Sequence, residues 1–326
     1  MVKAQIWGIL FLYSFMTAGY TGIIKTGERG GNRMPMRTDL AIEAAVLAQD
    51  GRAEALSGVR QESEQEGEMT LTRIIIENEE GAEALGRPLG TYITAELPPL
   101  TDDEEGMEEK AKRLGEELRA LLPPEGAVLV IGLGNEAITP DALGPHAVHM
   151  VMATRHIEGE FARSIGLDDL RPAAVLAPGV LGRTGMESGE IVRGVCGVIR
   201  PAAVIVVDAL AARSVARLGS TLQLCDTGIA PGSGVGNNRM LLNAETLGVP
   251  VIGMGVPTVV DARTIALELT GREESADSVT PRGEAMMVTP REIDLLIGRA
   301  SRLVAMVINA ALQPEYSPLS LIAAAK

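Results

Sequence analysis

The chain has 326 residues, and its 29 Lys and Arg residues against 43 Asp and Glu residues leave a net charge of −14. Such an acidic chain is not a basic nucleic-acid binder. With 46% hydrophobic residues, 22% charged residues and two cysteines, it can bury a core without disulfides, which excludes a disordered chain and a disulfide scaffold. The 37 glycines and only eight aromatic residues (three Phe, four Tyr, one Trp) indicate an aliphatic core with many tight turns.

The first segment differs from the rest. Residues 4–24 carry no charge and lie between Lys3 and Lys25, a length that suits a secretory signal or a membrane anchor. A second interpretation stays open: translation could begin at Met34 or Met36, after the glycine-rich residues 27–32, which would make the apolar run an artefact of an upstream start.

Two strands and a helix are expected in the acidic part that follows, at residues 69–76, 92–97 and 102–122. The rear part, beyond Pro123, contains short apolar runs of the kind that form parallel strands covered on both faces. These runs are residues 127–131, 173–176, 202–207, 221–224 and 249–254. With a final helix over residues 290–312, the pattern predicts a doubly wound α/β fold with a mostly parallel sheet.

Four aspartates follow these runs: Asp141, Asp208, Asp226 and Asp261. Because ligands collect at the carboxyl ends of parallel strands, we expect these carboxylates to gather on one edge of the sheet. Each one could instead cap a helix, and Asp208 directly precedes a helix-like stretch at residues 209–218. Paired carboxylates in a shared cleft would separate their pKa values and supply an acid and a base.

Other chemistries are less well supported. The sequence GLGNEA, residues 132–137, matches a loose dinucleotide-binding pattern, so a nucleotide-binding α/β module is an alternative. The loop PGSGVGNNR, residues 231–239, could present the backbone amides of Gly232, Ser233, Gly234 and Gly236 to an anion or could be a structural turn. No GxSxG, HExxH or CxxC motif occurs, and we assign no metal and no cofactor.

Several stretches longer than these motifs resemble one family, the germination proteases of spore-forming bacteria. The matching stretches are MRTDLAIEA (36–44), VIGLGNEAITPDALGP (130–145), VVDALAARSVARL (206–218), DTGIAPGSGVGN (226–237), ETLGVPVIGMGVPTVVDA (245–262) and MVTPREID (287–294). The resemblance implies an aspartic endopeptidase with catalytic Asp141 and Asp208, and a fold similar to that of hydrogenase-maturation proteases with a small N-terminal β/α extension. A protease of that maturation type, whose carboxylates recognise a bound metal, is a further alternative.

The resemblance also implies a self-processing zymogen that degrades small acid-soluble spore proteins, works in the cytoplasm of the developing spore and assembles as a homotetramer. In the family the processing site is an acidic residue followed by an apolar one, a pattern that Asp39 and Leu40 supply. We therefore expect cleavage between Asp39 and Leu40, which would divide the chain into an N-terminal segment, 1–39, and a protease domain, 40–326. The interval at residues 263–286 is shorter than in the family.

Overall fold

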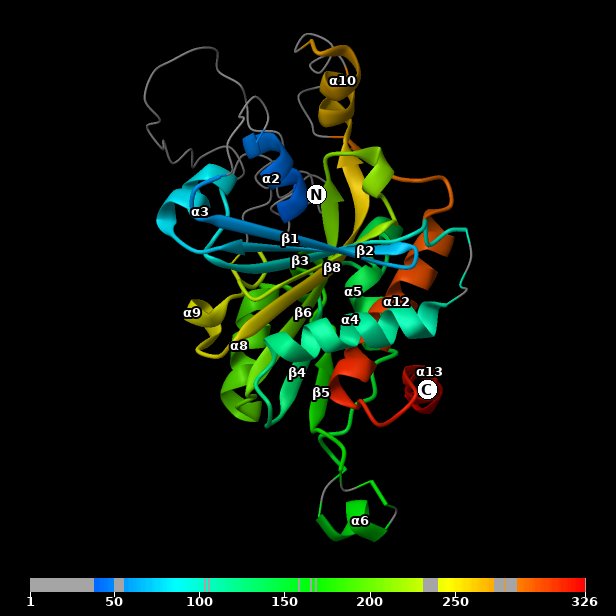
Figure 1. Cartoon of the computed structure of the whole chain (residues 1–326). Helices are drawn as coiled ribbons and strands as arrows, with labels where there is room; N and C mark the ends of the chain where they lie inside the picture. The colour runs from blue at the N-terminus through cyan, green and yellow to red at the C-terminus, as the bar shows by residue number, and fades with distance from the viewer. Residues whose placement is uncertain are drawn as a thin grey trace, which may run out of the picture. The chain divides into compact units, whose positions relative to one another are not determined.

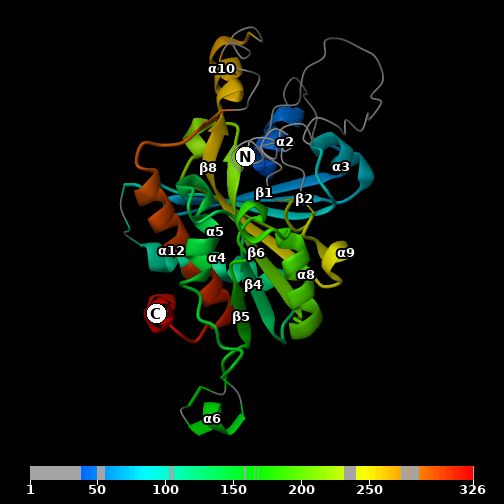
Figure 2. The same cartoon turned by 180° about the vertical axis from the view of Figure 1, so that it is seen from behind.

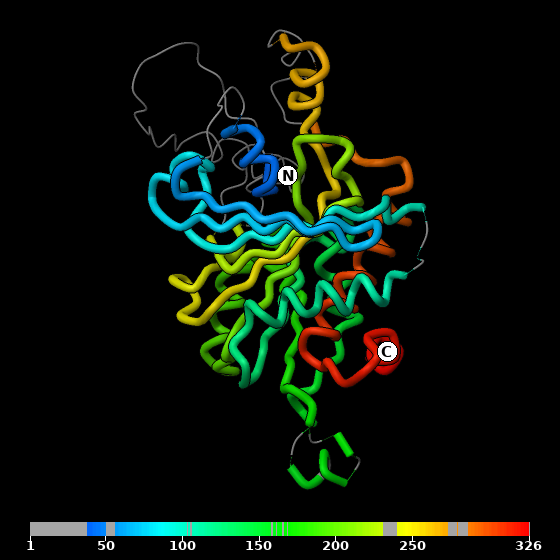
Figure 3. Tube along the Cα trace, viewed as in Figure 1, coloured from blue at the N-terminus to red at the C-terminus, as the bar shows by residue number. Residues whose placement is uncertain are grey.

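The computed structural model describes residues 38–49, 56–102, 104, 106–157, 159–164, 166–167, 169–230, 240–272, 279 and 286–325. All of these residues belong to one compact unit, Met36–Lys326. The apolar segment at residues 4–24, with its two interpretations, lies outside the described residues. Figure 3 follows the chain trace through this unit.

The described strands form one nine-stranded sheet in the order β1-β2-β3-β7-β8-β6-β4-β5, with β9 paired to β8 (Figure 1). Their bounds are β1 Val59–Glu66, β2 Met69–Ile76, β3 Gly90–Glu96, β4 Val128–Gly132, β5 Ala173–Leu176, β6 Ala203–Ala212, β7 Thr221–Cys225, β8 Val251–Asp261 and β9 Met287–Val288. The sheet joins the acidic front part and the apolar rear part of the chain in one fold.

The sheet has a parallel half and an antiparallel half. Strands β5, β4, β6 and β8 run parallel to one another, as the apolar runs predicted. Strand β7 was expected in the same parallel set, but it runs antiparallel to β8 and joins it to the meander β3-β2-β1. The short link from β6 to β7 contains only one 3-10 turn, η2 Val215–Arg217, and a parallel return needs a crossover of a dozen or more residues.

Helices cover both faces of the sheet. They are α2 Ala41–Gln49, α3 Glu79–Leu85, α4 Met107–Leu121, α5 Leu143–Val148, α6 Gly159–Ser164, α7 Leu181–Thr184, α8 Ser188–Ile199, α9 Ala244–Leu247, α10 Ala262–Thr270, α12 Ile293–Leu312 and α13 Pro318–Ala324, with a 3-10 turn η1 at Thr139–Asp141. Helices α4, α5 and α12 lie on one face, and α8 lies on the other (Figures 1 and 2). The α/β architecture predicted from the sequence is therefore confirmed.

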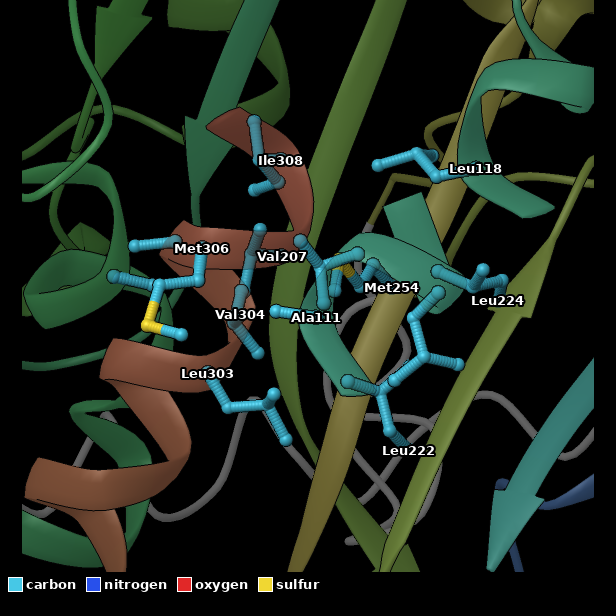
Figure 4. Close-up of a cluster of buried hydrophobic side chains, with 14 of the residues drawn as sticks. Ala111, Leu118, Val207, Leu222, Leu224, Met254, Leu303, Val304, Met306 and Ile308 are labelled. Carbon is cyan, nitrogen blue, oxygen red and sulfur yellow. The ribbon is translucent and has the colours of Figure 1, made fainter. Parts of the chain in front are cut away.

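Alternate residues of the central strands supply the two core layers. Val128 and Val130 of β4 pack with α4, α5 and α12, whereas Leu129 and Ile131 pack with α8 on the opposite face. This is the two-residue side-chain period of a strand, and it explains why β4 is apolar at every position. Figure 4 shows side chains of α4 and α12 packed around Val207 and Met254 of the central strands.

Helix α12 is the longest helix described, and in the described residues it alone is long and apolar enough to cross a membrane by composition. Its most apolar window is 78% buried within the fold. Leu303 and Val304 belong to the largest core cluster, so the hydrophobicity of this helix is used in packing against α4, α5 and the sheet.

The helix expected at residues 209–218 does not form. Strand β6 continues through Ala212, and the 3-10 turn η2 follows it. Neighbouring β8 is also long, and it pairs with β6 as far as Ala212↔Val260 with one register shift at Leu210/Ala211. Ladder hydrogen bonds to β8 therefore override the local helix preference of the sequence ALAARSVARL. Asp208 accordingly lies inside a strand and does not cap a helix.

Candidate active site

The strand order creates a crevice at the carboxyl end of β4. From β4 the chain passes through α5 to β5 on one side, and then through α8 to β6 on the other side of β4. Adjacent parallel strands whose connections leave in opposite directions form a topological switch point, where ligands bind in α/β sheets. Asp141 follows β4, and Asp208 lies on β6 one residue beyond the last β4 pairing, Gly132↔Val207.

A tight loop after β4 holds Asp141. Gly134 has a φ of +119°, and a Cβ atom there would lie 1.9 Å from the Asp141 carbonyl oxygen, so only glycine suits this position. The Asn135 amide donates a hydrogen bond to Asp141 Oδ2 at 2.8 Å. The buried Thr258 hydroxyl of β8 donates to the Pro140 carbonyl at 2.7 Å, which ties the loop to the sheet.

Asp208 is almost completely buried, with 7% of its surface exposed. The Ala209 amide donates to Asp208 Oδ1 at 2.9 Å. Across the ladder, Gly255 of β8 pairs with Asp208. A Cβ atom at Gly255 would lie 2.4 Å from the Asp208 carbonyl oxygen and 2.7 Å from the Leu210 side chain, so β6 and Leu210 approach this position too closely for any residue but glycine.

One cavity of about 480 Å³ contains both residues. Its walls are mostly apolar, a composition typical of substrate pockets. The apolar lining includes Leu133, Ile138, Leu210, Ile229, Leu241, Met254 and Met287. The polar lining includes Asp39, Arg87, Asp141, Asp208, Gln223 and Thr258. Asp39, from the predicted processing site, thus lies against the same cavity as Asp141 and Asp208.

The segment around Asp39 is held firmly. Asp39 exchanges hydrogen bonds with Ala211 of β6, its amide donating to the Ala211 carbonyl at 2.8 Å and its Oδ2 accepting from the Ala211 amide at 2.8 Å. The Arg87 guanidinium donates to the Thr38 carbonyl at 2.6 Å. Leu40 is fully buried in the core cluster that includes Tyr92. It directly precedes α2.

The other two aspartates have structural contacts elsewhere. Asp261 caps α10 by accepting from the amides of Arg263 and Thr264. Asp226 accepts from the Thr91 amide at 2.8 Å, beside the start of β3. The expectation that all four carboxylates share one edge is therefore wrong for Asp226, because the antiparallel direction of β7 carries its carboxyl end to the opposite end of the sheet.

Two neighbouring groups of the cavity remain protonated near neutral pH. Burial raises the pKa of the Tyr92 phenol to about 12, and its hydroxyl donates to the Pro88 carbonyl at 3.0 Å. Burial also raises the pKa of the Cys225 thiol, which donates to the Gly228 carbonyl. A nucleophilic cysteine needs a lowered pKa, so Cys225 is a packing residue.

The remaining sequence hypotheses have different outcomes. The glycine-rich loop with Gly232, Ser233, Gly234 and Gly236 lies outside the described residues. GLGNEA does not open a helix, since η1 at Thr139–Asp141 follows it, so the turn lacks the helix N-terminus that a dinucleotide-binding loop requires. Among the described residues, no group of three or more His, Cys, Asp or Glu side chains could hold a metal ion.

Sequence reasoning missed Gln223 and Arg87. Gln223 lies on β7 with 6% of its surface exposed, and its side-chain amide contacts the chain on both sides of Leu40. A glutamine within a strand carries no motif signal. Only the strand register, which pairs Gln223 with Gly255, identifies it as a neighbour of the Asp208 position.

Comparison with known proteins identifies the chain as a peptidase. A family model described as Germination protease matches residues 38–270. The chain therefore belongs to the germination protease family, as its motifs indicated, and it is a hydrolase that acts in spore germination.

Named relatives agree with that assignment. A germination protease of Caldanaerobacter subterraneus is 42% identical over 310 residues, covering 86% of this chain and 94% of the relative. That of Clostridium perfringens is 41% identical, covering 86% and 96%, and that of Bacillus velezensis is 35% identical, covering 90% and 98%. Among solved structures, the NiFe hydrogenase maturation protease HycI from Thermococcus kodakarensis is similar at a TM-score of 0.35 and 17% identity, covering 60% of this chain and 98% of that one.

Proposed function

We propose that the chain is an aspartic-type endopeptidase in which Asp141 and Asp208 act as a catalytic pair. The observation that carries the proposal is their position on one cavity, which Asp39 of the candidate processing site also lines. Asp141 comes from a loop fixed by Asn135, and Asp208 comes from the interior of β6. A hydrogen-bonded loop and a central strand hold the acid and the base in place, so the reaction needs little reorganisation of the site.

The pair would work by acid–base catalysis. One ionised carboxylate accepts a proton from the attacking water, while the other, protonated, polarises the carbonyl and then donates its proton to the leaving amine. Proton transfers of this kind contribute about 10²–10⁴ in rate. Because interacting carboxylates titrate as a unit, the two roles belong to the pair and not to one named residue. Backbone amides of the loop containing Gly232 are a further candidate for stabilising the oxyanion.

The substrates that we propose are small acid-soluble spore proteins, cleaved after an acidic residue that precedes an apolar one. The same specificity would lead the chain to cleave itself between Asp39 and Leu40 and to discard the segment 1–39. The place of Asp39 against the cavity supports this self-processing. We further propose that the enzyme works as a homotetramer in the cytoplasm of the developing spore, without a metal or another cofactor.

The test is to incubate the purified full chain, alone and with acid-soluble spore protein, and to analyse the fragments by mass spectrometry. We expect the chain to acquire Leu40 as its N-terminus and to cleave the spore protein. Asp141→Asn and Asp208→Asn should each abolish both cleavages without unfolding the protein. Asp226→Asn is the matched control, because Asp226 lies outside the cavity and keeps an acceptor oxygen for Thr91. Cleavage at the wild-type rate by either Asp141→Asn or Asp208→Asn would refute the proposal.

A further inference from the structure

The side-chain amide of Gln223 spans the peptide bond at which we expect processing. Its Nε2 donates to the Asp39 carbonyl oxygen at 2.9 Å, and its Oε1 accepts from the Ala41 amide at 2.7 Å. A carbonyl can only accept and an amide N–H can only donate, so one orientation of the Gln223 amide satisfies both partners. The Nε2 donor is thereby aimed at the carbonyl of the Asp39–Leu40 bond.

The register of the sheet places Gln223 on the side of Asp208. Gly255 of β8 pairs with Asp208 on one neighbouring strand and with Gln223 on the other. Residues that pair across neighbouring strands project from the same face of a sheet, and two strand spacings amount to roughly 10 Å. Asp208, Gln223 and Gly255 all line the cavity.

From these contacts we infer that Gln223 is a catalytic residue of the self-processing reaction, whose Nε2 stabilises the negative charge that develops on the Asp39 carbonyl oxygen. The inference rests on the proposed cleavage between Asp39 and Leu40. When water adds to this carbonyl, its oxygen gains charge and the neutral Gln223 donor binds it more strongly than it binds the ground state. As the tetrahedral intermediate collapses, the C–N bond to Leu40 breaks and the amine takes its proton from the carboxyl pair.

Ala211 completes this arrangement. Strand β4 pairs with β6 only as far as Val207, and Asp39 hydrogen-bonds to β6 further along the strand. The Ala211 amide donates a hydrogen bond to the Asp39 carboxylate, which favours an acidic side chain before the cleaved bond. Ala211 thus fixes the position of the segment around Asp39 along β6, and Gln223 contacts the Asp39 carbonyl in that position.

Two variants of the full chain separate the donor from the packing of Gln223. Gln223→Met fills similar space without hydrogen-bonding groups, and Gln223→Glu keeps an acceptor for Ala41 but loses the donor when ionised. We expect each to slow formation of the Leu40 N-terminus by about 10²–10³-fold near neutral pH, the usual cost of removing one oxyanion donor. Mass spectrometry gives the rates, and thermal unfolding checks that the variants fold.

The pH profile distinguishes a catalytic from a structural role. A protonated carboxyl regains an O–H donor, so the deficit of Gln223→Glu relative to wild type should shrink on acidification, whereas that of Gln223→Met should stay constant. A folded Gln223→Met chain that processes within threefold of wild type, while Asp208→Asn does not process, overturns this inference alone. An equal, pH-independent deficit in both Gln223 variants also overturns it. Processing by Asp208→Asn at the wild-type rate refutes the proposed function itself.

Discussion

Asp208 of β6 and Gln223 of β7 both pair with Gly255, so one glycine separates the candidate acid–base residue from a buried amide on the same face of the sheet. Only glycine suits this position on the cavity wall, because a Cβ atom there would lie 2.4 Å from the Asp208 carbonyl oxygen and 2.7 Å from the Leu210 side chain. The relationship links the sheet register directly to the shape of the candidate active site.

Gly255→Ala should therefore impair both stability and cleavage. Its methyl group would lie 2.4 Å from the backbone oxygen of Asp208, and backbone cannot rotate aside. Overpacking of this kind costs about 1–3 kcal/mol in the free energy of unfolding, measured by urea denaturation. The control is Gly298→Ala on α12, where a Cβ atom has no neighbour within 4 Å. This control should stabilise the helix by about 0.5–1 kcal/mol, and equal losses for both variants would contradict the argument.

Thr258→Val should loosen the Asp141 loop. The variant keeps the shape of the side chain but removes the hydrogen bond from the Thr258 hydroxyl to the Pro140 carbonyl, next to Asp141. We expect a loss of about 0.5–1.5 kcal/mol in unfolding free energy, the net worth of one hydrogen bond, because the Pro140 carbonyl loses its partner, and a slower cleavage rate. Thr94→Val is the matched control, since the buried Thr94 hydroxyl has no hydrogen-bond partner among the described residues. A larger loss for Thr94→Val than for Thr258→Val would count against this reading.

Asp39→Ala should slow self-processing by removing the carboxylate that accepts from the Ala211 amide. A hydrogen bond to a charged group is worth about 1.5–3 kcal/mol, which corresponds to a slowing of roughly 10–100-fold. Asp39→Asn keeps an acceptor oxygen and should lose less. Timed mass spectrometry of the N-terminus measures both, and a faster rate for the alanine variant than for the asparagine variant would contradict the role given to Ala211.

Glu117 of α4 should make the free energy of unfolding fall as the solution becomes acidic. Burial raises the pKa of this carboxyl, but hydrogen bonds from Arg73 and Arg113 outweigh burial and hold the pKa below the ordinary value of 4.5. A carboxyl with a lowered pKa in the folded state contributes its full stability above its unfolded pKa, and that contribution is lost as the pH falls through the lowered value.

Glu117→Gln should accordingly reduce the unfolding free energy at neutral pH by about 1–3 kcal/mol and flatten its decline in acid. Urea denaturation at neutral pH and below the lowered pKa measures both effects. Glu62→Gln is the control, because the Glu62–Arg60 pair on β1 is more than half exposed on both side chains and should matter little. If the unfolding free energy of Glu117→Gln declined in acid as steeply as that of wild type, other groups would be the cause of the decline.

Local sequence patterns predicted the positions of most central strands and of two of the helices that cover them. The apolar runs became β4, β5, β6, β7 and β8, and the amphipathic stretch and the final apolar stretch became α4 and α12. Asp141 and Asp208 were selected from the ends of two apolar runs, and both line the cavity. Periodicity and strand-end position suffice for such assignments because they reflect which faces of an element are buried.

The tertiary structure alone decided the direction of β7, the extension of β6 past Asp208, and the meeting of Asp39 with Gln223 over 184 positions of sequence separation. None of these is encoded by a local preference. Strand direction and register depend on which neighbouring strand supplies the hydrogen bonds, and a buried glutamine acquires its role only from the groups that the register brings to its amide. The composition of this chain therefore determined an α/β protein, whereas pairing between distant strands determined its site.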